Sequence, residues 1–334
     1  MLVFTGEKGT GRRMAELKRR GFMAAAASLA LAPRLARADT FPSKAVRIIV
    51  PYPPGGGTDI VARLVGPRLT ERWKQTVIIE NKAGASGIVG SEVVAHAPPD
   101  GHTLMIMTGA HTVNPVTTKH LPYDTEKDFT PITTVAASPL GLIGSVRAGM
   151  DSMAKFIAAA RQPAGIQFGS SENTTRLGGE LFRLRSGLKM ENVAYKGAAP
   201  MMQDLVGGHI PVAFSTPLST MSHHRAGTAR ILSIASNKRL QVIADVPTME
   251  EAGIKGVIQQ NWFSMFGPGG MPPELAKQIQ SDVAAVLAEP DTLAKIHDLG
   301  AEPGGEPPDV FARQVHEEIA MWTAVAKEAG IEPE

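Results

Sequence analysis

Short apolar segments alternate with amphipathic ones from residue 46 onward, and this alternation limits the possible folds more than any other feature. Strands are expected at 46–50, 77–80 and 104–107, and helices at 59–73 and 88–97. Strands that alternate with helices form parallel βαβ units whose helices cover both faces of a sheet. The sequence therefore predicts an α/β fold.

The alternation is interrupted once and then returns. Residues 114–131 are expected to be mostly loop, because Pro115, Pro122 and Pro131 would break a long element, and residues 132–145 are expected to be extended. A second series of alternating strands and helices follows, which indicates two α/β lobes with a ligand cleft between them. The predicted division is lobe 1 at 39–137 plus 264–334 and lobe 2 at 138–263.

The N-terminus has the three regions of an export signal. Arg-Arg-Gly-Phe at 19–22 is similar to a twin-arginine signal. The apolar run at 24–31 is too short to span a bilayer, and Ala-Arg-Ala at 36–38 provides the small residues that a signal peptidase requires. We predict a signal peptide at 1–38, cleaved after Ala38, and a periplasmic protein. The sequence leaves open the start codon, Met1 or Met14, and the choice between twin-arginine and general secretion.

Removal of this segment would change the net charge. Residues 1–38 contain eight Lys and Arg but two Asp and Glu, so a net charge of +2 would become −4. The basic character therefore belongs to the leader and gives no reason to expect nucleic-acid binding. No later apolar run is long enough to predict stable membrane insertion. The absence of cysteine excludes disulfides and thiolate chemistry.

The glycine-rich loop at 51–59 is the clearest candidate for a binding site. It follows the first expected strand and enters the first helix, and its glycines let the backbone approach a ligand closely. Thr58 can cap the helix, and the free N–H groups of a helix N-terminus favour an anion. The loop lacks the Gly-Lys-Ser/Thr of a nucleotide site. A tight turn without a ligand is the alternative.

Two further loops follow the same pattern. Small residues at 81–90 follow the second strand and open the second helix, and Ser, Asn and Thr residues at 169–175 do so in the second series. Neutral hydroxyl and amide groups are suitable donors to a carboxylate, because they carry no charge to desolvate. Ordinary helix capping would explain about half of these hydroxyl groups equally well.

Residue patterns of catalytic and metal sites are missing from the sequence. There is no Gly-x-Ser-x-Gly elbow and no His-Glu-x-x-His pair, and the adjacent His223 and His224 lack the helical spacing of a metal site. His111, after the third expected strand, could contact a ligand, although a lone histidine is more often structural. We therefore predict no enzyme, no metal site and no cofactor.

Motifs spread over the whole mature chain resemble those of the Bug (TctC-like) family, the extracytoplasmic solute receptors of tripartite tricarboxylate transporters. Each motif is modest, but their order over about 220 residues is very specific. In chain order they are 51–59 with Ala62-Arg63, 81–90, 99–104, Asn114-Pro115, 121–124, 127–132, 193–197, 204–208, 246–248, 251–253, Trp262 and Pro268-Gly269.

The resemblance implies a type II periplasmic-binding-protein fold, in which extended hinge segments join two α/β lobes. It also implies that loops after the first strands of each lobe hold a carboxylate of the ligand. The contacts implied in lobe 1 are Tyr52, Pro53, Gly56, Thr58, Asp59, Ala85 and Ser86. Those implied in lobe 2 are Ser170, Ser171, Thr174 and Thr175, and less directly Tyr195, Lys196 and Ser215.

The chain departs from the family pattern in two places. The loop at 169–175 is shorter than usual, and Arg176 stands before Leu177 where the family carries a histidine. Arg176 could bind a second carboxylate, or it could be an arginine on an exposed helix face. Pro67 interrupts the first helix, where it predicts a kink.

The resemblance implies a periplasmic solute-binding protein that captures a small carboxylate-bearing solute. It would deliver this solute to the integral-membrane permease subunits of a tripartite tricarboxylate-type transporter, and a monomer is expected. The same clamp could instead serve as a ligand sensor for a signalling partner. A hydrolase or lyase of this architecture is a third hypothesis, which no nucleophile–base pair supports. The identity of the solute beyond its carboxylate stays open.

Overall fold

The computed structural model describes residues 1–3, 41–329 and 333. Residues 1–40 and 41–334 form two separate units, and the second contains every helix and strand named below. The predicted export motif and its cleavage after Ala38 lie outside the described residues. None of the described helices is both long enough and apolar enough to cross a bilayer.

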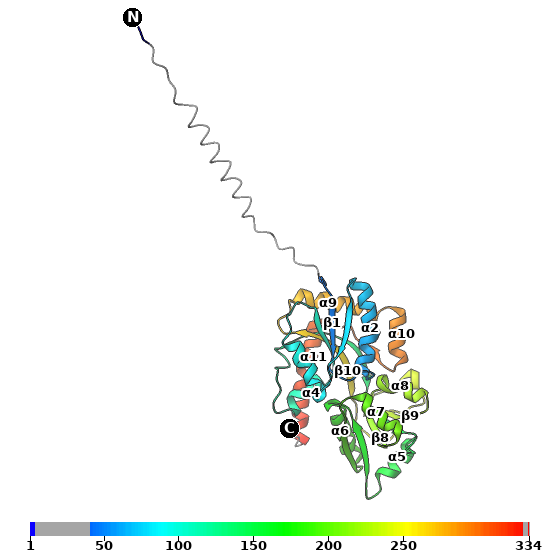
Figure 1. Ribbon diagram of the computed structural model, residues 1–334. Coiled ribbons are helices and arrows are strands. Elements are labelled where there is room, and N and C mark those ends of the chain that lie inside the picture. Colours follow the sequence, from blue (N-terminus) through cyan, green and yellow to red (C-terminus); the bar gives the residue numbers. More distant parts are fainter. Residues whose placement is uncertain (4–40, 330–332, 334) are drawn as a thin grey trace. The chain divides into compact units, whose positions relative to one another are not determined.

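Strands and helices alternate through most of the second unit (Figure 1). The strands are β1 (Val46–Val50), β2 (Val77–Asn81), β3 (Thr103–Thr108), β4 (Phe129–Pro139), β5 (Gly141–Ser145), β6 (Ile166–Ser170), β7 (Met190–Ala194), β8 (Val212–Ser215), β9 (Ala229–Ile234), β10 (Gln260–Pro268) and β11 (Glu302–Pro303). The helices are α2 (Gly57–Trp73), α3 (Ile88–Ala95), α4 (Ala110–Thr117), α5 (Met153–Ala160), α6 (Asn173–Ser186), α7 (Ala198–Gly207), α8 (Pro217–Arg225), α9 (Pro273–Leu287), α10 (Pro290–Asp298) and α11 (Pro308–Ala329), with short 3-10 turns η1 (Ala85–Gly87) and η2 (Gln241–Ile243).

The strands form two separate sheets. The first has the order β11-β4-β10-β3-β1-β2, with β1 parallel to β2 and β3, whereas β10 runs antiparallel to β3 and β4. The second has the order β7-β6-β8-β5-β9, with β6 parallel to β7 and β8. We call the first sheet with its helices lobe 1 and the second lobe 2. The predicted α/β fold with two sheets is confirmed.

The chain crosses between the lobes twice, and the two crossings lie side by side. It leaves lobe 1 between β4 and β5 and returns between β9 and β10. The Leu140 N–H donates to the carbonyl of Gln259 at 2.9 Å, and Pro139 pairs with Gln260 in the β4–β10 register. We call these four residues the hinge. The predicted lobe boundaries at 137/138 and 263/264 stay a prediction.

Strand alternation gives lobe 2 an apolar core on each face of its sheet. Leu142 and Phe214 pack into the cluster under α5 and α6, while their neighbours Ile143 and Ala213 pack into the cluster under α7 and α8. Successive side chains of a strand point to opposite faces, so a sheet covered on both sides is apolar in consecutive residues. Lobe 1 has one larger core around β1, β3 and β10.

One helix extends into a segment that was expected to be loop, and the kink expected at Pro67 stays a prediction. Residues 110–117, expected in part as loop, form helix α4 with Pro115 inside it. One proline removes a single intrahelical hydrogen bond, and buried Val113 and Asn114 hold the helix against α11 and α6. Pro67 lies inside α2, which runs as one helix from Gly57 to Trp73.

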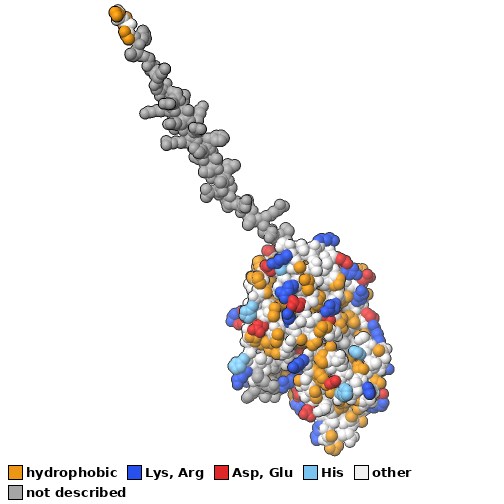
Figure 2. Space-filling view, viewed as in Figure 1, with side chains coloured by type: hydrophobic (Ala, Val, Ile, Leu, Met, Phe, Trp, Pro, Cys, Tyr) orange, Lys and Arg blue, Asp and Glu red, His pale blue; other side chains and the backbone are white. Residues whose placement is uncertain are grey.

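Acidic and basic side chains are interspersed over the visible face of the second unit (Figure 2). Many of them form exposed ion pairs, such as Lys155 with Asp151 and Arg225 with Asp298. Exposed pairs of this kind contribute about 0–1 kcal/mol each. The packing of the two lobes therefore depends on their cores and on the hinge.

We predict that Gly178→Ala destabilises the protein by about 1–3 kcal/mol, because its new methyl group would overlap Leu140 and Gln259 of the hinge. The direction of this stability change is informative, since Gly→Ala inside a helix ordinarily stabilises a protein by about 0.5–1 kcal/mol. Urea unfolding measures the effect. Gly207→Ala is the matched control, because its only close neighbour is the exposed ring of His209, which can move away. Equal stability changes in the two variants would contradict this account of the hinge.

Candidate functional site

A small cavity lies between the two sheets, at the ends of their parallel strands. Its volume is about 20 Å³, which is enough for about one water molecule. The residues that line it come from both lobes. They are Tyr52, Gly56, Gly57, Thr58, Thr108, Ser171, Glu172, Thr175, Ala198, Ser215, Thr216, Ser219, Asn261 and Phe263.

Four helix N-termini converge on this cavity. Helix α2 follows β1, and α6, α7 and α8 follow β6, β7 and β8, and each contributes a cap or first-turn residue to the lining. The first N–H groups of a helix have no partner within the helix, and the aligned peptide dipoles leave partial positive charge at this end. Pro217, the first residue of α8, and Pro200, the third residue of α7, lack an N–H. The arrangement favours an anionic group in the cavity.

The side chains around the cavity are mostly neutral hydrogen-bonding groups. Eight of them carry a hydroxyl group, and among the described residues that line the cavity there is no Lys, Arg or His. Hydroxyl and backbone N–H groups can bind a carboxylate without the desolvation that a buried cation would need. The cavity can thus hold an organic anion through neutral donors.

Asp59 shapes the predicted glycine-rich loop and does not line the cavity. Its buried carboxylate accepts from the Gly55 N–H at 3.0 Å and from Arg63 at 2.9 Å, and its other oxygen accepts from Asn81 at 3.0 Å. Burial acts to raise the pKa of Asp59, but these hydrogen bonds outweigh it and lower the pKa overall. Asn81 also donates to the Tyr52 carbonyl at 3.0 Å, so the carboxylate fixes both ends of the loop.

Six of the sequence-predicted residues line the cavity: Tyr52, Gly56, Thr58, Ser171, Thr175 and Ser215. The structure places the others nearby or elsewhere. Pro53 lies against Gly197 of lobe 2. Ser170 ends β6, where its carbonyl accepts from the Tyr195 N–H.

The second predicted loop, at 81–90, contacts the first loop, at 51–59, without lining the cavity. Ala85 and Ser86 have left-handed backbones with φ of 45° and 51°, which is uncommon for residues other than glycine. This turn directs the Ser86 carbonyl toward Tyr52 and Asn114, whose side chains donate to it at 3.4 and 3.2 Å. Ala85 and Ser86 therefore hold the lining residue Tyr52 in place and are not themselves in the lining.

Four further predicted residues occupy other places. The Tyr195 hydroxyl donates to Asp204 at 2.8 Å; burial and this carboxylate raise its pKa to about 12. Lys196 is exposed, and Arg176 is half-buried on α6; neither is among the lining residues. Thr174 points in a different direction from Thr175 and borders a different cavity.

His111 lies in the core of lobe 1. Its ring is fully buried among Tyr123, Phe129 and Phe266, with the nearest ring centroid 4.6 Å away. Neither ring nitrogen has a hydrogen-bond partner among the described residues, and burial lowers the pKa of His111 to about 3. The structure thus gives it the structural role that the sequence left as the alternative.

Glu172 is the most consequential lining residue that the site prediction lacked. It precedes α6 in lobe 2, where its carboxylate caps the helix by accepting from the Thr175 N–H, yet the same carboxylate is also held by lobe 1. Thr108 donates to Oε2 at 2.6 Å and Asn261 donates to Oε1 at 2.7 Å. Burial raises the pKa of Glu172, with the hydrogen bonds acting in the opposite direction. Its position in a loop of neutral residues gave no sign that it would turn inward.

Other missed residues differ in how well the sequence could have revealed them. Thr216 followed by Pro217 after a strand is a recognisable helix start, and Thr216 does accept from the Ser219 N–H. Asn261 and Phe263 lie near the start of β10, and only the approach of the lobes brings them to the cavity.

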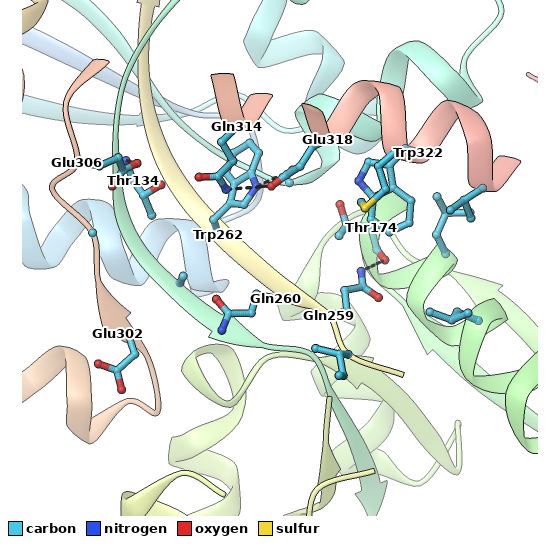
Figure 3. A pocket seen from close by; sticks show the side chains of 18 of the residues that line it. Thr134, Thr174, Gln259, Gln260, Trp262, Glu302, Glu306, Gln314, Glu318 and Trp322 are labelled. Carbon is cyan, nitrogen blue, oxygen red and sulfur yellow. Dashed lines mark hydrogen bonds between the residues drawn. The ribbon is translucent and has the colours of Figure 1, made fainter. Parts of the chain in front are cut away.

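A larger cavity, of about 600 Å³, lies on the other face of β10 (Figure 3). Trp262 faces it, while its neighbours Asn261 and Phe263 face the small cavity. Four glutamates line it, and one of them, Glu318, accepts from Trp262 at 2.9 Å and from Gln314 at 2.9 Å. With these acidic side chains and an apolar wall from α6 and α11, it is less suited to a carboxylate.

Residues 61–331 match the model of the Tripartite tricarboxylate transporter family receptor, TctC. Protein BugT of Bordetella pertussis is 30% identical over 298 residues, which cover 88% of this chain and 91% of that protein. The resemblance seen in the sequence is confirmed.

Solved structures give the same result for the fold. The R. palustris protein Rpa4515, solved with adipate, superposes with a TM-score of 0.84 and is 36% identical, covering 88% of this chain and 100% of that one. MatC from Rhodopseudomonas palustris, solved with bound malate, has a TM-score of 0.79 and 29% identity, covering 85% and 99%. The predicted periplasmic-binding-protein fold is confirmed.

We predict that Asp59→Asn destabilises the protein by about 1–3 kcal/mol at pH 7, because the new amide turns an N–H toward the donors of Gly55 and Arg63. The lowered pKa of Asp59 means that its carboxylate stabilises the fold above the unfolded-state pKa of about 3.9. That contribution disappears as the pH falls through the lowered pKa, so the two proteins should converge toward pH 3.

Urea unfolding at pH 7 and pH 3 measures this difference. Asp151→Asn is the control, because water and salt screen its exposed pair with Lys155, so the substitution should leave the stability nearly unchanged. A constant difference between Asp59→Asn and the unmodified protein across this range would contradict the assignment.

Proposed function

Because the chain belongs to the receptor family of tripartite tricarboxylate transporters, we propose that it captures a small carboxylate-bearing solute between its lobes and delivers it to the permease subunits of such a transporter. The proposal places the protein in the periplasm, as a monomer without catalytic activity. The finer points of export, cleavage after Ala38 and a twin-arginine route, belong to the same proposal.

The convergence of four helix N-termini on one cavity is the observation that best supports this function. A carboxylate there would accept hydrogen bonds from first-turn N–H groups of α2, α6 and α7 and from hydroxyls such as Thr58 and Ser171. Because these donors come from both lobes, a bound carboxylate would hold the lobes together. The adipate and malate in the two similar solved proteins support a carboxylate as the common feature.

The small size of the cavity indicates how the site works. About 20 Å³ is too little for an organic acid, so the lobes must separate to admit one. The hinge pairs Leu140 with Gln259 by a backbone hydrogen bond, and small backbone rotations there can open the lobes. The solute then shifts the equilibrium toward a closed form in which it bridges both lobes.

We predict that a small organic acid raises the melting temperature of the mature protein. A ligand that binds only the native state stabilises it by about 2.7 kcal/mol at a concentration one hundred times its dissociation constant. A thermal-shift screen of mono- and dicarboxylates against uncharged analogues measures this. If acids and uncharged analogues leave the melting temperature equally unchanged, carboxylate capture is wrong.

We also predict that Gly57→Ala weakens the affinity for any acid found in that screen by about tenfold or more. A methyl group there would lie 2.5 Å from Ser219 Oγ and 2.8 Å from the Phe263 ring, so the lobes could not close fully. Isothermal titration calorimetry measures the change. Gly66→Ala, the same substitution in the same helix but outside the cavity, should keep the original affinity. Equal affinities in both variants would contradict closure around α2.

A further inference from the structure

Glu172 places an acid in a cavity that otherwise offers neutral donors. It is the only charged side chain among the described residues that line the cavity, and its side chain is almost completely buried. The helix N-termini attract an anion to the same small volume. A ligand must therefore place its negative charge at the helix N-termini and keep that charge away from the carboxylate of Glu172.

A network from lobe 1 fixes the orientation of this carboxylate. The Gly109 N–H donates to Asn261 Oδ1 at 3.1 Å, so the amide group of Asn261 must present Nδ2 to Glu172. Oε1 of Glu172 is thereby defined as an acceptor, and Thr108 occupies one position on Oε2. The Thr175 N–H donates to the same carboxylate in the capping box of α6. An ionised carboxylate has about four acceptor positions, so these three contacts leave capacity for one donor on the ligand.

We propose that Glu172 selects the solute: it accepts a hydrogen bond from a donor on the ligand, an ammonium group above all, and it excludes acids that would place a second ionised carboxylate at that position. The expected ligands are thus amine-bearing carboxylic acids, held by their carboxylate at the helix N-termini and by their ammonium group at Glu172. This selection rests on the proposed carboxylate capture and names the class of solute for the same site.

The charges of the lining residues favour an ammonium group on the ligand over a second carboxylate. An ammonium group beside Glu172 forms a charge-assisted hydrogen bond in a site shielded from water, which is stronger than a neutral one. A second carboxylate would instead meet a like charge with no basic lining residue to offset it. The proteins solved with adipate and malate hold dicarboxylates, so we infer that this receptor differs from them in specificity.

Pairs of acids that differ only in one end group test the proposal. Calorimetry would compare β-alanine with succinate, γ-aminobutyrate with glutarate, and δ-aminovalerate with adipate, using the purified mature protein at neutral pH. Each pair exchanges an ammonium group for a carboxylate on the same chain. In at least one pair the amine-bearing acid should bind at least about tenfold more tightly.

Glu172→Gln is the matched variant. Glutamine keeps an acceptor for Asn261 and offers an N–H to the Thr108 oxygen, so it preserves the shape of the network without its charge. The preference for the amine-bearing acid should fall by about tenfold or more in this variant. An unchanged preference would overturn the role of Glu172.

A second readout needs no variant. Burial raises the pKa of Glu172, so its carboxylate becomes protonated at a higher pH than an ordinary glutamate, and the preference for the amine-bearing acid should decrease as the pH is lowered. Tyr52, the only other titratable side chain in the described lining, stays neutral because burial and then Glu172 raise its pKa well above the usual value. The neighbouring strands β3 and β10 contribute Thr108 and Asn261, which do not titrate. A preference for the amine-bearing acid that does not change with pH would contradict the proposed role of Glu172.

The outcomes separate this inference from the proposed function. Tighter binding of the dicarboxylates, unaffected by Glu172→Gln, would overturn the selection while leaving carboxylate capture intact. Binding of neither member of any pair, with no response to the wider screen of acids, would overturn carboxylate capture and the selection with it.

Discussion

The pairing of β4 with β10 determines where both cavities lie. These strands run together from Phe129 and Pro268 to Pro139 and Gln260, at the point where the chain passes between the lobes. Because side chains alternate along a strand, one face of β10 contributes Asn261 to the small cavity and the other contributes to the large one. The backbone of β4 and β10 thus joins the lobes and forms the hinge, and β10 also separates the small polar cavity from the larger, more apolar one.

The small cavity combines two opposed electrostatic features. Helix N-termini from both lobes favour an anion, whereas Glu172 presents a fixed carboxylate held by Thr108 and Asn261. These hydrogen bonds cross from lobe 2 to lobe 1, so the residue proposed to select the solute also belongs to the contact between the lobes. Specificity and closure are therefore physically connected at this residue.

The sequence predicted the fold well because strand and helix periodicity are local properties. It also located the loops after β1 and β6, since glycine, serine and threonine at a strand-to-helix junction have a local physical meaning. It could not place Glu172 or Asn261, whose roles depend on contacts between distant segments. His111 shows the converse: a polar residue after a strand turned into an aromatic core, which no local pattern distinguishes from a site.

The central claim is that a carboxylate binds between the lobes where the four helices begin. A crystal structure of the mature protein with an acid selected by binding measurements tests this most directly. The account predicts carboxylate oxygens within hydrogen-bond distance of the N-termini of α2 and α6, with the lobes closed around the acid. Density for the acid in the larger cavity beside Trp262 instead, with the small cavity unchanged, would contradict it.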